Sequence, residues 1–411
     1  MTRSAGAAQR PALSRWMSRS NDITQQFLSI GGRPDFISMA GGLPASEFYP
    51  VEAVARAAQS AITRWGPAAL EYGPVEGFPA LRAHIAERLT RQTGRPFGVE
   101  NVLLTVGAMQ GLDLVGKVLL DPGDTIVAQY PTYVGALDAW RPRYPVYDPL
   151  DWTIDGATSI KRLAEAKFVY AVPNYSNPTG VLVPTTERAA LLDKVLRAGT
   201  WLLEDDPYLP LQYDAPAGPS LLALHAELEP AGIYNGPVIY LGTLSKSIAP
   251  GLRVGWAAAS PRMIQAMAIA KQSSDLASSM LSQATALELL ESGLEDHHIP
   301  KIVAHYRERR DALCAAAQAE LSTWYEWETP PGGMFVWMRA RHSEIDTDRL
   351  YTHALNEKVA FVPGSVFDPA GALTSAMRIN FTRNPPETLR EGVARLARAT
   401  RHYLAADGIT K

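Results

Sequence analysis

Short apolar segments alternate with longer amphipathic segments over most of the chain from about residue 50. Six apolar runs have the length and composition of buried β-strands: NVLLTVG, TIVAQ, FVYAV, TWLLED, VIYLGT and RVGWAAAS. Helical patterns lie between several of them, such as Gly111 to Leu120 and Pro184 to Ala198. This alternation predicts an α/β fold with a mostly parallel sheet that is covered by helices on both faces.

The pattern changes after about residue 295. A long charged helix, HHIPKIVAHYRERRDALCAAAQAEL, precedes three separate strand patterns, MFVWMR, VAFVPG and AMRINFT. We therefore expect a large domain over residues 36–295 and a smaller α+β domain over 296–411, which packs with the N-terminal segment. Residues 1–35 form an expected arm or lid: the first 20 residues hold four arginines, four serines and no acid. That composition resembles a transit peptide, but no periodic apolar pattern accompanies the charges, which favours an arm.

The charge and cysteine content narrow the functional classes. The 411 residues include 39 basic and 42 acidic side chains, a net charge of −3, so no nucleic-acid or membrane-surface partner is expected. One cysteine, Cys314, permits no internal disulfide and fits a cytoplasmic protein. No apolar run approaches the ~18 residues of a membrane span. The histidines lack metal-ligand spacing, and we interpret His297 and His298 as solvated helix surface.

In parallel sheets, ligands bind at the carboxyl ends of the strands, so the residues after each apolar run are the candidates for chemistry. The glycine turn GAMQG, residues 107–111, opens a helix and offers backbone N–H groups to an anion. Tyr133 follows the next strand, and Asn177 follows the one after it within NYSNPTG. Each of these features, taken alone, also fits an ordinary turn or packing role.

Asp205, Asp206 and Lys246 are the charged residues at the ends of the later strands. A carboxylate at the end of a buried strand costs free energy unless a positive group meets it; for Asp206, helix capping is an alternative. Arg253, seven residues after Lys246, suits a phosphate. An anion cradle, an aromatic ring, an amide, a carboxylate and a lysine together match a phosphorylated, planar, protonated heteroaromatic aldehyde. Pyridoxal 5′-phosphate (PLP) fits that description.

With these residues in place, the chain resembles the fold-type I, class I/II PLP-dependent aminotransferases, most closely the aminoadipate/kynurenine-type subgroup. The resemblance covers about Phe36 to Phe381. It rests on eight motifs in the family's order: ISMAGGLPASEFYP, LEYGPVEGFPALR, LLDPGDTIVAQYPTY, NPTG, EDDPY, SKSIAPGLRVGW, PPGGMFVW and MRINF.

The resemblance implies a role for each cofactor-binding residue. Lys246 is the Schiff-base lysine and proton shuttle, and Asp205 pairs with the pyridine nitrogen. Tyr208 and Asn177 hydrogen-bond the phenolic oxygen, and Tyr133 stacks on the ring. The implied phosphate ligands are Thr243, Ser245, Arg253, the backbone of Ala108 and Met109, and Tyr72 of the partner subunit.

On the substrate side, the resemblance implies that Arg378 binds the α-carboxylate and that Gly42 lines the site. The segment SNDITQQFLSIGG, residues 20–32, should fold over the substrate; it contains Asp22 and no arginine. This favours a cationic or neutral side chain over an acidic one, although Asp22 also suits a helix N-cap. Two positions depart from the family pattern. Ala108-Met109 replaces a common Ser-Gln, and Gln129 replaces a common acid.

We therefore predict a homodimeric PLP-dependent aminotransferase with shared active sites. It should move an amino group from an L-amino acid to a 2-oxo acid in a ping-pong cycle. The motifs leave open another carbanion reaction of the same cofactor, such as elimination, cyclisation or oxidation. A PLP-binding regulator is disfavoured, because only about 35 residues precede the fold, too few for a DNA-binding domain.

Overall fold

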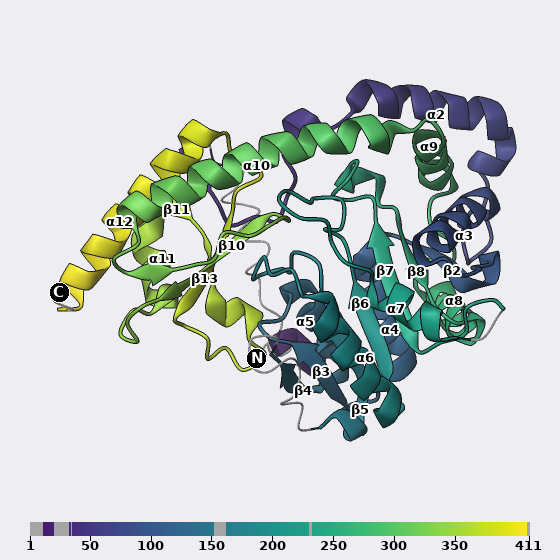
Figure 1. Ribbon diagram of the computed structural model, residues 1–411, viewed down its shortest axis with the longest axis horizontal. Coiled ribbons are helices and arrows are strands. Elements are labelled where there is room, and N and C mark those ends of the chain that lie inside the picture. Colours follow the sequence, from purple (N-terminus) through teal and green to yellow (C-terminus); the bar gives the residue numbers. More distant parts are fainter. Residues whose placement is uncertain (1–10, 20–32, 34, 152–161, 230–231, 409–411) are drawn as a thin grey trace, which may run out of the picture.

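The computed structural model describes residues 11–19, 33, 35–151, 162–229 and 232–408 (Figure 1). Within these ranges lie a seven-stranded sheet, a four-stranded sheet and a separate pair of two-residue strands. The strands of the large sheet are β2 (Val102–Thr105), β3 (Thr125–Gln129), β4 (Val146–Leu150), β5 (Ala166–Ala171), β6 (Trp201–Asp205), β7 (Val238–Thr243) and β8 (Gly255–Ala258).

The large sheet has the strand order β2-β8-β7-β6-β5-β3-β4. The pairs from β7 to β4 are parallel, and β8 runs antiparallel to both β7 and β2. This confirms the predicted α/β fold with a mostly parallel sheet. Strand β4 was not predicted, because its sequence VYDPL contains Asp and Pro and several of its side chains are exposed or half-buried. This edge strand lacks the continuous apolar run that indicates a buried strand.

Side chains alternate along each strand, and the alternation produces two apolar layers. Leu103, Leu203 and Ile239 pack in the layer with α4, α5 and α8. Leu104 and Val238 pack in the opposite layer, with α3, α6, α7 and α9. The helices of this part are α2 (Val51–Trp65), α3 (Pro79–Thr93), α4 (Ala108–Leu119), α5 (Val134–Trp140), α6 (Thr185–Ala198), α7 (Leu221–Leu228), α8 (Pro261–Asp275) and α9 (Met280–Glu291).

The C-terminal part is built on the antiparallel sheet β12-β13-β10-β9. Its long helix α10 runs from the neighbourhood of α9 across to α12 (Figure 1), and Pro300 lies in its second turn. The strands are β9 (Tyr325–Glu326), β10 (Phe335–Ala340), β12 (Val362–Pro363) and β13 (Ala376–Asn380), and the helices are α10 (Leu294–Glu320), α11 (Thr347–Asn356) and α12 (Pro386–Ala406).

Two predicted elements differ from the structure. The segment VAFVPG forms two short strands instead of one. Strand β11 (Val359–Ala360) pairs in parallel with β1 (Ile37–Ser38), whereas β12 pairs with β13. Helix α4 begins at Ala108, not at Gly111, because Gly107 adopts the left-handed φ of 73° that ends the turn. Gly111 is thus a helical residue, where an added Cβ would approach the Leu241 side chain to 2.7 Å.

None of the helices in the described ranges combines the length and apolar character needed to cross a bilayer. Over the same part of the chain, no group of three or more His, Cys, Asp or Glu side chains is arranged to hold a metal ion.

Candidate active site

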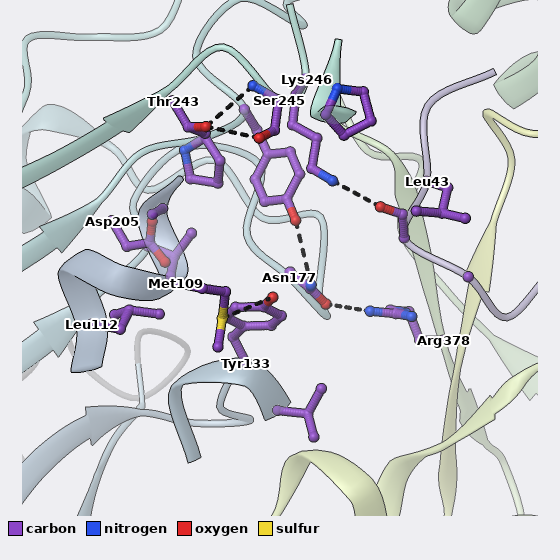
Figure 2. Close-up of a pocket in the computed structure, with 18 of the residues that line it drawn as sticks. Leu43, Met109, Leu112, Tyr133, Asn177, Asp205, Thr243, Ser245, Lys246 and Arg378 are labelled. Carbon is purple, nitrogen blue, oxygen red and sulfur yellow. Dashed lines mark hydrogen bonds between the residues drawn. The ribbon is translucent and has the colours of Figure 1, made fainter. Parts of the chain in front are cut away.

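A cavity of about 340 Å³ lies where the carboxyl ends of β5, β6 and β7 face the small sheet (Figure 2). The elements around it are far apart in sequence, from residues 40–43 to β13. All but two of the predicted site residues line this cavity: Gly42, Ala108, Met109, Tyr133, Asn177, Asp205, Tyr208, Thr243, Ser245, Lys246, Arg253 and Arg378.

The two exceptions are Tyr72 and Asp22. Tyr72 is 85% exposed and lines a separate surface hollow together with residues 277–281. Asp22 lies outside the residues that the structure describes. The cavity is therefore built, within the described residues, without either of them.

Lys246 follows β7, and its side chain points into the cavity (Figure 2). Its Nζ donates a hydrogen bond to Gly42 O at 2.8 Å. The pKa of this amine is lowered to about 8, chiefly by burial and to a smaller extent by the positive charges of Arg378 and Arg253, while Asp205 opposes the change. A substantial neutral fraction therefore exists near physiological pH, as a nucleophile or a proton acceptor requires.

Asp205 ends β6 and is only 3% exposed. Its Oδ2 accepts a hydrogen bond from Tyr170 Oη at 3.0 Å, whereas its Oδ1 is buried without a hydrogen-bond partner in the described part of the chain. Burial raises the pKa of Asp205 to about 7; the Tyr170 hydrogen bond and Lys246 oppose the rise, and Asp206 adds to it. An unpaired buried carboxylate oxygen of this kind suits a cationic nitrogen of a bound group.

Glu204 and Asp206 flank Asp205 but have their partners elsewhere. Glu204 accepts hydrogen bonds from Leu221 N and Leu222 N, both at 2.9 Å, at the start of α7. Asp206 accepts from Asn174 Nδ2 at 2.9 Å and from Tyr240 Oη at 3.1 Å. The helix-capping alternative for Asp206 was therefore wrong, because no helix begins after it before Leu221; Glu204 is the acid that caps a helix.

The end of the cavity near Thr243 and Ser245 has the composition of an anion site (Figure 2). The two hydroxyl oxygens lie 2.9 Å apart, and Ser245 N donates to Thr243 Oγ1 at 3.1 Å. Helix α4 begins at the same end, with Ala108 and Met109 in its first turn. A Cβ on Gly107 would lie 2.7 Å from Arg253 Nη2. The glycine thus lets a guanidinium approach the helix N-terminus, and both groups favour an anion.

Arg378 lies at the opposite end of the cavity, on β13 (Figure 2). Its Nη1 donates to Asn177 Oδ1 at 2.7 Å and its Nη2 to Ala40 O at 2.6 Å. Its Nε is buried without a hydrogen-bond partner in the described ranges. The guanidinium carbon lies 4.2 Å from the ring centroid of Phe335 and 5.0 Å from that of Phe367. Burial lowers the pKa of Arg378 to about 10, so it remains a cation available to a carboxylate.

Between the two ends, Asn177 Nδ2 donates to Tyr208 Oη at 3.3 Å, and Tyr133 Oη lies 3.7 Å from Met109 Sδ. Burial raises the pKa of the Tyr133 phenol to about 12, which keeps it neutral. Sequence reasoning missed Tyr170 and the apolar wall that contacts the Arg378 end. Tyr170 lies within the apolar run FVYAV, and nothing in that run distinguishes it from an ordinary core residue of a buried strand. The wall residues come from three distant segments: Leu43, Val134, and the stretch that holds Val362, Val366 and Phe367.

Gln129, which departs from the family pattern, has a structural role. Its Nε2 donates to Ser176 Oγ at 2.6 Å, and its Oε1 accepts from Val172 N at 2.7 Å. The amide thereby ties the end of β3 to the loop that carries Asn177. It does not line the cavity.

Residues 35–396 match the family model described as aminotransferase class I and II. The chain is 38% identical over 386 residues to aromatic-amino-acid aminotransferase 1 of Thermococcus litoralis, a match that covers 91% of this chain and 90% of the relative. It is also 38% identical over 386 residues to a 2-aminoadipate transaminase of Thermus thermophilus, with coverage of 93% and 94%.

Among solved structures, the chain resembles an α-aminoadipate aminotransferase from Thermus thermophilus complexed with N-(5′-phosphopyridoxyl)-L-leucine. The TM-score is 0.85 at 36% sequence identity, and the match covers 96% of this chain and 98% of that chain. The similarity therefore extends over both sheets and the cavity between them.

Proposed function

The chain belongs to the aminotransferases of class I and II, and from this premise we propose that it transfers the amino group of an L-amino acid with a neutral, largely apolar side chain. The family predicted from the sequence is thus confirmed. The enzyme uses PLP and acts on an amino acid and a 2-oxo acid. The proposal concerns the role of each site residue, the class of substrate and the assembly.

The residues of the cavity fit PLP at three points. The N-terminus of α4 with Thr243, Ser245 and Arg253 offers donors to a phosphate. The unpaired Oδ1 of Asp205 offers a negative partner to the pyridine nitrogen. The amine of Lys246, with its lowered pKa, is available for covalent attachment. We assign these residues, with Tyr133, Asn177 and Tyr208 beside the ring, to the cofactor.

When bound, PLP withdraws electrons from the substrate carbon that loses its proton. Lys246 Nζ is the group that we assign to remove and return that proton, because it is the amine in the cavity whose pKa lies near neutrality. Arg378 binds the α-carboxylate and fixes the substrate's orientation. Phe335 and Phe367 exclude water from this ion pair, since their rings lie against the guanidinium.

The observation that carries the substrate class is the apolar wall beside Arg378. Leu43, Val134, Val362, Val366 and Phe367 line it. The charged residues that line the cavity in the described ranges are Asp205, Lys246, Arg253 and Arg378, and each already has an assigned role. A charged substrate side chain would then be desolvated without a partner, which is costly. The names of the two relatives refer to different substrate classes: one to aromatic amino acids and the other to 2-aminoadipate, which is acidic.

A panel of half-reactions, followed by the cofactor's absorbance, tests this class. We expect kcat/KM for leucine- or phenylalanine-like amino acids to exceed that for glutamate and lysine by at least about tenfold, the factor for 1.4 kcal/mol. A preference for glutamate or 2-aminoadipate would refute it. A preference for lysine or arginine would instead favour the role predicted for Asp22, and Asp22→Asn should then abolish that preference.

We further propose a homodimer in which Tyr72 completes the partner's phosphate site. The support is its position: Tyr72 is 85% exposed beside Leu70, which is 66% exposed, and it lies outside its own chain's cavity. Mixing Tyr72→Phe chains with Lys246→Ala chains tests this arrangement. One site of the mixed dimer would carry both defects and the other neither, so activity should partly recover. No recovery despite demonstrated subunit exchange would contradict it.

We also propose residues 36–295 as the cofactor-binding domain, 296–411 as the smaller domain and 1–35 as an N-terminal arm. The start of α10 at Leu294 and the four-stranded sheet within residues 325–380 support this division. Strand β1 pairs with β11, so residues 37–38 pack with the smaller domain. Limited proteolysis that cut repeatedly within residues 40–290 and spared the junctions would argue against it.

A further inference from the structure

Tyr170 makes the two oxygens of Asp205 unequal. It lies on β5, the strand beside β6, and it is fully buried. Its hydroxyl donates to Asp205 Oδ2 at 3.0 Å. Asp205 Oδ1 is buried, has no hydrogen-bond partner in the described residues, and belongs to a side chain that lines the cavity. One oxygen is therefore held by the protein and the other is left for a bound group.

The position of the Tyr170 ring is itself fixed. The ring meets the indole of Trp140 edge-on, with centroids 5.1 Å apart and planes at 83°. Trp140 is fully buried, and its Nε1 donates to Leu112 O at 2.9 Å. Leu112 belongs to α4, the helix whose N-terminus forms the anion end of the cavity. The Tyr170 hydroxyl is thus positioned relative to Asp205 and also, through Trp140 and Leu112, relative to the anion end of the cavity.

We propose that Tyr170 is a positioning residue that acts through Asp205: it turns Oδ1 of the carboxylate toward the pyridine nitrogen and keeps the carboxylate ionised. This inference rests on the role proposed above for Asp205. Tyr170 does not line the cavity, so it has no direct contact through which it could serve the cofactor.

The charges around Asp205 explain why the hydrogen bond matters. The titratable groups that act on Asp205 by charge or hydrogen bond are Tyr170, Tyr133, Tyr208 and Lys246, together with Asp206 on the opposite face of the strand. The tyrosines are neutral at physiological pH. Asp206 disfavours a second negative charge. Lys246, which is about nine tenths protonated at pH 7, favours the ionised carboxylate less than the Tyr170 hydrogen bond does. The Tyr170 hydroxyl is therefore the neutral donor that offsets part of the cost of burying the ionised carboxylate. Its removal should move the pKa of Asp205 upward from about 7.

The chain offers a matched control. Tyr240 is also buried and donates to a buried carboxylate, Asp206 Oδ2, at 3.1 Å. It lies in the opposite apolar layer of the sheet, and neither Tyr240 nor Asp206 lines the cavity. Tyr170→Phe and Tyr240→Phe each remove one phenol–carboxylate hydrogen bond and nothing of the ring. They differ in whether the carboxylate faces the cofactor.

The experiment is equilibrium dialysis of the holoenzymes against graded PLP, at neutral and at mildly alkaline pH. We expect Tyr170→Phe to bind PLP at least about tenfold more weakly at neutral pH, the factor that corresponds to one pKa unit. The ratio of its dissociation constant to that of the wild type should shrink at alkaline pH, where the carboxylate ionises again. Tyr240→Phe should retain wild-type affinity at both pH values. Equal, pH-independent effects of the two variants, or none, would overturn the proposal.

Asp205→Asn separates this inference from the role of Asp205 itself. If Asp205→Asn leaves PLP affinity unchanged, the proposed role of Asp205 fails. If Asp205→Asn weakens binding and Tyr170→Phe does not, only the inference about Tyr170 fails. On the Asp205→Asn background, Tyr170→Phe should weaken PLP binding no further, because the carboxylate through which it acts is gone.

A second variant covers the case in which Tyr170→Phe does not accumulate as folded protein. 3-Fluorotyrosine inserted at position 170 by codon suppression keeps the hydroxyl and the ring but makes the phenol a stronger donor. It should stabilise the ionised carboxylate and tighten PLP binding at neutral pH. Unchanged or weaker binding would contradict the proposal.

Discussion

The cavity and the packed interior around the large sheet both bury charged side chains. The two regions differ in how completely these side chains are hydrogen-bonded. In the interior, Lys271 donates to Asp275 at 2.9 Å, and Arg188 donates to four backbone or amide oxygens at 2.7–3.3 Å. In the cavity, Asp205 Oδ1 and Arg378 Nε have no partner in the described residues. Buried polar groups without partners are costly. Both of these atoms belong to charged side chains that line the same cavity, which indicates groups kept free for ligands.

Three charged residues of the cavity each have a buried counterpart of the same type in the interior: Lys271 for Lys246, Asp206 for Asp205 and Arg188 for Arg378. If the distinction holds, changes in the cavity should affect catalysis, and changes in the interior should affect stability.

Lys246→Ala should have the largest effect. It removes both the attachment point of PLP and the proton-transferring amine, and proton transfer by a positioned side chain alone contributes about 10²- to 10⁴-fold. We therefore expect kcat to fall by more than about 10⁴-fold, with PLP still bound noncovalently, as measured by single-turnover absorbance. Lys271→Ala should instead lower the melting temperature and leave kcat near the wild-type value. Normal turnover by Lys246→Ala would end the assignment.

Asp205→Asn should reduce kcat/KM by at least about 10²-fold, because the pyridine nitrogen loses a buried charge partner. Asp206→Asn should chiefly reduce the free energy of unfolding, by about 1–3 kcal/mol for a weakened buried network. Steady-state kinetics and denaturant unfolding measure the two effects. The reverse pattern would mean that Asp206, not Asp205, serves the cofactor.

Arg378→Lys should weaken every amino acid substrate alike, since the guanidinium binds the shared α-carboxylate and lysine cannot reproduce its planar geometry. The loss of one charged hydrogen bond corresponds to an increase in KM of about 10- to 150-fold. Arg188→Lys, which breaks contacts with Val183 O and Pro219 O, should lower stability and leave KM unchanged. A change confined to one class of substrate would place Arg378 at the side chain instead.

The smallest effect concerns pH. The pKa of Lys246 in the unliganded protein is lowered to about 8, and the neutral amine is the nucleophile. Its neutral fraction rises from about one tenth at pH 7 to about nine tenths at pH 9. Incorporation of PLP into apoprotein, trapped with borohydride, should accelerate accordingly. In Arg378→Gln the curve should move to higher pH, because a neighbouring positive charge is lost. A midpoint near 10.5 in the wild type would show that burial does not tune this amine.

Part of the site was predictable because short local sequence patterns indicate it. A lysine between serines after an apolar run, a carboxylate at the end of another run, and a glycine turn before a helix are each visible in one segment. Parallel strands bring their carboxyl ends together, which is why these separate signals converge. Tyr170 carried no such signal. In the run FVYAV it looks like any other apolar strand residue, and only the pairing of β5 with β6 sets its hydroxyl against Asp205.

The sequence by itself determined the alternating strands and helices, the family and the residues at the strand ends, because periodicity and local motifs encode these directly. The tertiary structure decided which of three consecutive acids faces the cavity. Strand alternation directs Glu204 and Asp206 to α7 and Tyr240, and Asp205 to the opposite face. It also decided that Leu43, Val134, Val362, Val366 and Phe367 line one cavity, and that Phe335 and Phe367 lie against Arg378. These contacts join residues from distant segments, and the spacing of residues along the chain carries no information about them.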